Sequence, residues 1–207
     1  KPPKKPLHFR DLRHEHRVFF VGEIAKQNIQ TVSVCVHKPS IMERDVFRER
    51  YRLYFYATKL VLQRISWCCR DNPMQSTLGD GGVDLVFSNR SGMSYREMAE
   101  YIQRLRRASG EGNMDWRVIR ENRIEAVSPI KKMGLHLADA VASSVFYAFE
   151  PSRLGYTETR YLEMLKSTLY QHGGKYFSYG LKTWPKEADE LIHSDPQLRW
   201  MNEWTSK

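Results

Sequence analysis

The residue with the clearest chemical potential is Asp139, which stands in the first turns of a predicted helix. Its neighbours Ala138, Ala140 and Ala142 have small side chains, so a backbone or a ligand can approach this part of the helix closely. A carboxylate in such a place could bind a divalent cation, because hard ions prefer oxygen ligands. Asp139 also fits a structural role, since an acidic side chain near a helix start complements the helix dipole. The residues alone leave both interpretations open.

A second group of potential ligands lies near the N-terminus. Imidazole and carboxylate side chains crowd one short segment there: His8, Asp11, His14, Glu15 and His16. Such a mixture is typical of transition-metal sites, so a mononuclear centre built from His8, Asp11 and His14 is one hypothesis. His14 and His16 cannot share a helix face, because residues two apart point well away from each other. The alternative is a solvated helix start with one histidine near an active cleft.

Basic residues gather in three places along the chain and fit a phosphate-binding role. Contacts of this kind follow the backbone of a nucleic acid, so binding would depend on salt and tolerate different sequences. Cations at a helix C-terminus also complement the helix dipole, which offers a structural explanation for the first of the three clusters. The clusters are Arg104, Arg106 and Arg107 at the end of one predicted helix; Arg117, Arg120 and Arg123 at three-residue spacing; and Lys131 and Lys132 before the helix of Asp139.

Composition and charge narrow the classes of protein to consider. The 207 residues include 33 Lys and Arg against 24 Asp and Glu, and this net charge of +9 favours an anionic partner. The length and the 41% hydrophobic content predict one folded domain with an appended segment. Three cysteines are too few for a disulfide framework and suit a reducing compartment, so we expect a cytoplasmic protein.

Neither a membrane span nor a signal peptide is expected. The longest apolar stretch without charge, residues 140–149, is about half of the roughly 20 residues that a spanning helix needs. The basic, Pro-rich residues 1–6 lead into no apolar signal core. The sequence also starts without Met, and we expect residues upstream of Lys1 to be missing from it.

The elements that must position these side chains alternate between strands and helices. Strands are predicted at residues 31–36, 83–87 and 124–128, and helices at 14–28, 43–69, 94–108, 135–149, 158–172 and 185–192. Ser94 and Glu97 have the spacing of a capping box at the start of the third helix. Alternation of this kind predicts an α/β layer fold with at least partly parallel strands.

Residues 134–142, with the sequence G-L-H-L-A-D-A-V-A, resemble the G-L-Q-x-A-D-x-x-A motif of the domain-of-unknown-function 3800 family. Members of that family are ribonuclease-H-like proteins found mostly in bacteria, phages and mobile elements. Other stretches resemble further family segments in the same order: residues 7–12, 31–38, 53–57, 83–101 and 180–185. The resemblance spans nearly the whole chain, and the G-L-x-x-A-D core is its most specific part.

The resemblance implies a ribonuclease-H-like, retroviral-integrase-like mixed sheet flanked by helices. We expect this core, incomplete at its N-terminus, over residues 1–150, and a helical extension packed on it over residues 151–207. Active enzymes of that fold use several carboxylates to hold two divalent metals, of which one activates water and the other stabilises the leaving oxygen. Asp139 then corresponds to the last acidic ligand and Asp84 to a second one, with Mg²⁺ or Mn²⁺ as cofactor. Lys131 or Lys132 would contact a phosphate.

The chain also departs from the family pattern. The family's first strand carries a D-E-S-G motif with the central metal ligand, and no such motif occurs here, so that strand is either missing from the sequence or absent from the protein. His136 replaces the Gln of the helix motif, and Ser88 and Asn89 stand where a further acid is expected. Asp84 is equally compatible with an ordinary polar residue at a strand start.

These observations support two main hypotheses. The first is a metal-dependent nuclease that hydrolyses phosphodiester bonds in RNA or DNA. The second is a catalytically inactive ribonuclease-H-like module that binds nucleic acid or a protein partner, which includes a second copy of the chain. The missing first-strand acid favours the second hypothesis. A phosphohydrolase built on His8, Asp11 and His14 ranks below both.

Overall fold

The computed structural model describes residues 8–42, 44–72, 81–108 and 114–205, which form two compact units. Unit 1 comprises Lys1–Ile41 and Pro129–Lys207, and unit 2 comprises Met42–Ser128. Helices and parallel strands occur in both units, which confirms the predicted α/β class. The Pro-rich lead-in at residues 1–6 and the helix break at residues 109–113 lie outside the described residues.

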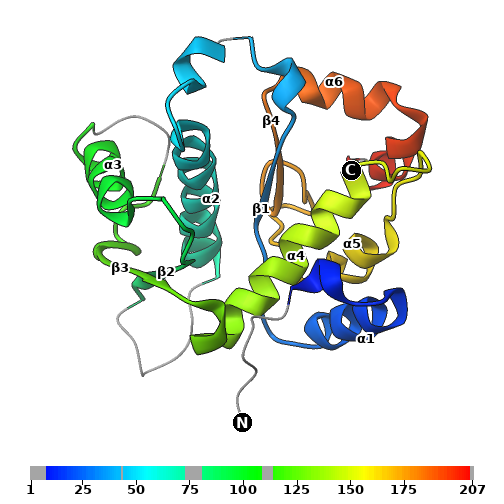
Figure 1. Cartoon of the computed structure of the whole chain (residues 1–207), viewed down its shortest axis with the longest axis horizontal. Coiled ribbons are helices and arrows are strands. Elements are labelled where there is room, and N and C mark those ends of the chain that lie inside the picture. Colours follow the sequence, from blue (N-terminus) through cyan, green and yellow to red (C-terminus); the bar gives the residue numbers. More distant parts are fainter. Residues whose placement is uncertain (1–7, 43, 73–80, 109–113, 206–207) are drawn as a thin grey trace. The chain divides into compact units, whose positions relative to one another are not determined.

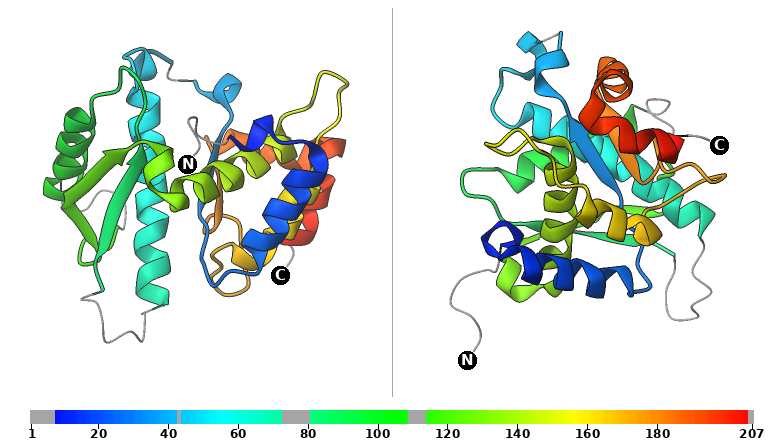
Figure 2. Two further views of the ribbon diagram at one scale, coloured as in Figure 1. Left: turned by 60° about the horizontal axis from the view of Figure 1, so that its bottom comes forward. Right: turned by 90° about the vertical axis from the view of Figure 1, so that its right-hand side faces the viewer.

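Unit 1 is built on two parallel strands, β1 (Ser33–Val36) and β4 (Leu181–Trp184). Three of its helices lie side by side (Figures 1 and 2): α1 (His14–Ala25), α4 (Met133–Phe149) and α5 (Arg160–Met164). A fourth, α6 (Glu187–Ser194), packs beside β4, and α7 (Asn202–Thr205) follows near the C-terminus. Its short 3-10 helices are η1 (Phe9–Asp11), η2 (Lys38–Ser40), η4 (Pro129–Lys131), η5 (Lys166–Thr168) and η6 (Pro196–Met201).

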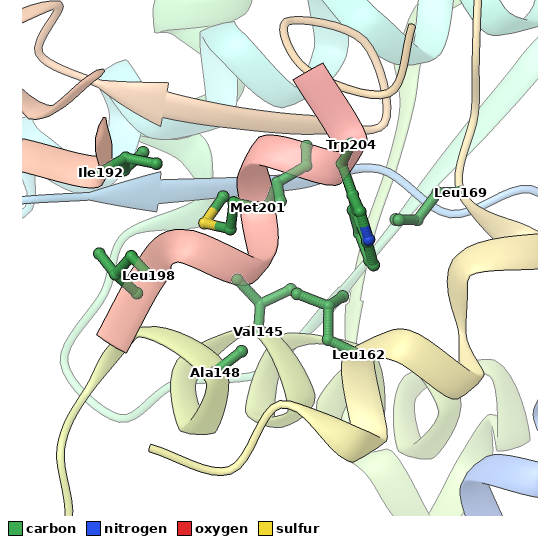
Figure 3. Close-up of a cluster of buried hydrophobic side chains, with 9 residues drawn as sticks. Val145, Ala148, Leu162, Leu169, Ile192, Leu198, Met201 and Trp204 are labelled. Carbon is green, nitrogen blue, oxygen red and sulfur yellow. The ribbon is translucent and has the colours of Figure 1, made fainter. Parts of the chain in front are cut away.

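One hydrophobic cluster of unit 1 joins α4 to the C-terminal segment. Its buried members come from α4, α5, the residue after η5, β4 and the last helices: Val145, Ala148, Leu162, Leu169, Leu181, Ile192, Leu198, Met201 and Trp204. Figure 3 shows the side chains of Val145 and Ala148 pointing from α4 toward Leu198 and Met201. Burial of this apolar surface stabilises the segment after residue 150 together with α4. Residues of the expected extension over 151–207 thus share a hydrophobic cluster with α4.

Unit 2 pairs β2 (Val83–Ser88) with β3 (Ile119–Val127), again in parallel. Figure 2 shows the two green strands with α3 (Tyr95–Arg107) and the cyan helix α2 (Arg52–Asp71) beside them. A hydrophobic cluster of this unit contains the buried side chains Leu62, Leu85, Met93, Met98, Ile102 and Ile119. Ser94 caps α3 as predicted, since its side chain accepts a hydrogen bond from the Glu97 N–H at 3.2 Å.

Two predicted helices are shorter than expected. The helix predicted over residues 43–69 begins only at Arg52, because Tyr51 has a φ of 67° in the left-handed region, which no helix interior contains. A short 3-10 helix, η3 (Arg44–Phe47), stands before it. The helix predicted over residues 158–172 ends at Met164, and Leu169 instead forms a bridge with Thr31.

The strands also differ from the prediction. β3 begins at Ile119 and not at residue 124, and β4 is not predicted at all. Among the described residues, the strands form two parallel pairs and no mixed sheet, so the finer ribonuclease-H-like assignment stays a prediction. Within this part of the chain, no helix is long and apolar enough to cross a membrane.

Candidate functional site

Asp139 lies on the second turn of α4 and faces the N-terminal segment of unit 1. Its Oδ2 accepts a hydrogen bond from the backbone N–H of Phe9 at 2.9 Å and lies 3.9 Å from Nδ1 of His8. The side chain is 40% exposed. Since the helix dipole acts mainly within the first turn, the dipole explanation is weak here. Asp139 instead attaches η1 to α4, and its side chain stays partly exposed to solvent.

Asp84 has a different environment, at the start of β2 in unit 2. Its two carboxylate oxygens lie 3.1 Å from Nη1 of Arg120 and 3.3 Å from Nη1 of Arg123, both on β3. The side chain is half exposed, so solvent screens these ion pairs and each contributes little to stability. Asp84 is thus a cross-strand partner of two guanidinium groups, and it belongs to a different unit from Asp139.

A Mg²⁺ or Mn²⁺ site of the expected kind needs several carboxylates around one position. Among the residues that the structure describes, no group of three or more His, Cys, Asp or Glu side chains is placed to hold a metal ion. Asp139 uses one oxygen for Phe9, and Asp84 is engaged by two arginines. The described side chains therefore do not fit the two-metal centre, and we derive no hydrolytic step through it.

Some of the predicted arginines of unit 2 form ion pairs with carboxylates, and others form none among the described residues. Arg106 forms an ion pair with Glu121 of β3, and Arg117 binds both carboxylate oxygens of Asp115. The Arg117 guanidinium lowers the pKa of Asp115 to about 2, so this carboxylate stays charged at neutral pH. Arg104 and Arg107 are exposed and have no ion pair among the described residues.

The predicted lysine cluster lies in unit 1. Lys131 ends η4 and Lys132 is the N-cap residue of α4, and both side chains are exposed. They stand about two helical turns before Asp139 in the sequence. The two predicted arginine clusters and the predicted lysine cluster thus belong to different units.

A polar cluster around Tyr161 replaces the predicted histidine metal centre. His14 lies with Nδ1 2.7 Å from the Tyr161 hydroxyl and 3.8 Å from a carboxylate oxygen of Glu158. Arg160 donates from Nη1 to Nε2 of the same ring at 3.3 Å. His8 is instead beside Asp139, and Asp11 is beside Arg10. The structure thus does not bring His8, Asp11 and His14 together as three ligands of one metal.

Sequence reasoning does not find this cluster, because Tyr161 is 147 positions from His14 and no local pattern connects them. Packing brings them together. Tyr161 is buried in a second hydrophobic cluster of unit 1, with the ring of Phe9 at 5.6 Å and that of Tyr147 at 6.0 Å. Burial raises the pKa of Tyr161 more than the nearby Arg17 lowers it, so the phenol stays protonated at neutral pH.

Arg17 also holds the N-terminal segment in place. It donates from Nε to the carbonyl of Phe9 at 3.2 Å and from Nη2 to that of Arg10 at 2.6 Å. Its guanidinium carbon also lies 4.8 Å from the centre of the Tyr147 ring. Arg17 is consequently a structural residue, engaged by backbone carbonyls and an aromatic face.

The cysteines do not form a nucleophilic site. Burial raises the pKa of Cys35 and of Cys68 to about 11 in each case, and the thiols therefore stay protonated at neutral pH. Because the thiolate is the nucleophilic form, these residues serve packing.

No family model, curated protein or solved structure matches the chain. The likeness to the domain-of-unknown-function 3800 family therefore stays a prediction from its motifs.

Proposed function

We propose that the chain binds nucleic acid through the phosphate backbone, as a module of the ribonuclease-H-like class. The observation that supports this proposal most directly is that Arg104 and Arg107 are exposed and have no carboxylate partner among the described residues. Both lie at the C-terminal end of α3. A guanidinium group offers a planar set of donors that matches phosphate oxygens, so two unpaired ones form a suitable contact surface.

The C-terminal end of α3, which presents these two arginines, is held in place by packing and by an ion pair. Residues three apart on a helix are neighbours, which places Arg104 and Arg107 next to each other on one face. Arg106 forms its ion pair with Glu121 and so connects the same helix end to β3. The remaining side of α3 is buried through Met98, Ile102 and Leu105. Binding through such fixed cations needs no base contacts and is therefore tolerant of sequence.

A pair of matched double variants tests the role of these arginines. Arg104→Gln combined with Arg107→Gln is expected to weaken binding of a labelled single-stranded oligonucleotide by about tenfold, because charge-assisted contacts are each worth roughly 1.5–3 kcal/mol before screening. Binding is measured by fluorescence anisotropy at low salt with RNA and with DNA.

The control removes the same charge from arginines that already have carboxylate partners. Arg96 pairs with Glu100, and Arg117 pairs with Asp115, so substitution of these two by Gln is expected to change affinity much less. An equal loss in both double variants would show that only net charge matters and would reject the end of α3 as the contact surface.

Nuclease activity is a second hypothesis that depends on Asp139, which is partly exposed beside the His8 ring but does not form a metal centre with the other described side chains. Asp139→Asn retains an oxygen that can accept the Phe9 N–H, so η1 can stay attached to α4. If Asp139 takes part in cleavage, this variant loses most of the Mg²⁺- or Mn²⁺-dependent cleavage of labelled RNA or DNA. Cleavage by the variant at the wild-type rate would remove Asp139 from the reaction.

A further inference from the structure

The polar cluster around Tyr161, which includes His14, has no role in the nucleic-acid binding proposed above. Its exposed part consists of two basic side chains in contact, His14 and Arg160, each the first residue of its helix. The side chain of His14 is 44% exposed. Arg160 is exposed, and within the described residues its guanidinium has no carboxylate partner. Two adjacent basic groups open to solvent are an arrangement that an anion would stabilise.

The contacts of the His14 ring favour one tautomer of the imidazole. A guanidinium group has only donors, so the contact at 3.3 Å requires Nε2 of His14 to be the acceptor. The ring hydrogen is then on Nδ1, which lies 2.7 Å from the Tyr161 hydroxyl oxygen. Protonation of Nε2 would bring two cations together and break the bond from Arg160.

We propose that His14 and Arg160 form a binding site for the terminal phosphate group of a phosphate monoester. Such a group is a dianion with three acceptor oxygens. It can accept two N–H groups from the planar guanidinium and one from Nε2, once that nitrogen has taken up a proton from solvent. The anion removes the repulsion between the two basic groups, so phosphate binding and protonation of His14 favour each other.

The surroundings of His14 are consistent with this coupling. The titratable and charged groups that face the ring or its phenol partner come from three helical elements: Glu158 and Tyr161 at α5, Arg17 on α1 and Tyr147 on α4. Glu158 lies 3.8 Å from Nδ1 and accepts the backbone N–H of Arg160 at 3.1 Å, so it connects the ring to the first turn of α5. Tyr161 is buried and held between aromatic rings, so it fixes the direction of the imidazole before any ligand arrives. Tyr161 is thus a positioning residue for the proposed site.

The first experiment uses the full chain with inorganic phosphate as the probe, followed by isothermal titration calorimetry. Arg160→Gln is expected to weaken binding by about tenfold, since a charge-assisted bidentate contact is lost. Arg153→Gln is the matched control, because Arg153 is an exposed arginine of the same unit. The affinity of this variant for phosphate is expected to stay at the wild-type value. Titrations in two buffers of different ionisation enthalpy are expected to report proton uptake, which a His14→Gln variant lacks.

The second experiment separates the two sources of such a phosphate. A nucleoside monophosphate represents free metabolites, and a 5′-phosphorylated oligonucleotide represents a nucleic-acid end, each compared with its unphosphorylated form. The experiment is carried out with the Arg104→Gln/Arg107→Gln variant, so that the proposed backbone contacts at α3 do not contribute to binding. Tighter binding of either phosphorylated form supports the site. Absence of phosphate binding by the wild type, or equal affinity in Arg160→Gln, would overturn it whatever becomes of nucleic-acid binding at α3.

Discussion

Leu162→Ala is expected to lower the free energy of unfolding by about 2–5 kcal/mol, the usual cost of a large-to-small change in a packed core. Leu162 has no exposed surface and lies in the cluster that joins α4 to the C-terminal helices, as Figure 3 shows. The change removes buried methyl groups and leaves a cavity between these elements. Chemical denaturation followed by circular dichroism measures the loss.

Leu154→Ala is the matched control for this substitution. Leu154 is 82% exposed in the same unit, so its truncation removes little buried surface and is expected to change stability by less than about 0.5 kcal/mol. Equal effects of the two substitutions would contradict the assignment of Leu162 to the core.

Gly180→Ala is expected to destabilise unit 1 by about 3 kcal/mol or more, because the added methyl group would have no space. A Cβ at this position would overlap the carbonyl oxygen of Tyr170 and lie 2.8 Å from its backbone nitrogen. These backbone atoms cannot move freely, since the Tyr170 N–H donates to Thr31 and the Gly180 carbonyl accepts from Ser33. Relief of the overlap would disturb the pairing of β1 with β4.

Gly134→Ala is the comparison for this variant. Gly134 lies in α4, and a Cβ there would have no neighbour within 4 Å in the described structure. Its replacement is expected to raise stability by about 0.5–1 kcal/mol, because alanine loses less backbone entropy in a helix. Thermal unfolding of both variants is the measurement, and a Gly180→Ala protein as stable as the wild type would show that Tyr170 is not packed against this position.

The elements that sequence patterns predicted are those with local signals. Helices α3 and α4 begin within two residues of their predicted positions, because Ser94 is a capping residue and α4 has a regular apolar stripe. β4 has no such signal, since it consists of four residues that include Lys182. Its stability comes from pairing with β1, which is distant in the sequence. The left-handed backbone conformation of Tyr51 could likewise not be predicted, because tyrosine is not a residue type that favours it.

The candidate sites, too, could be predicted only as far as local sequence patterns reach. The basic residues of α3 could be predicted as a cluster, but only the structure separates Arg106, which pairs with Glu121, from the two arginines without such a partner. Asp139 could be selected by its motif, whereas its hydrogen bond to Phe9 joins residues 130 positions apart. The contact between His14 and Tyr161 is equally remote in sequence. Long-range packing, which no local pattern encodes, decides each of these environments.

The most direct measurement is the salt dependence of oligonucleotide binding by the wild-type chain between about 50 and 200 mM salt. If Arg104 and Arg107 each neutralise a phosphate, a plot of log affinity against log salt has a slope of about −1.4 or steeper for a single strand, and the double Gln variant flattens it by about 1.4. A wild-type chain without affinity at low salt, or a slope that the double substitution leaves unchanged, would contradict binding at the end of α3.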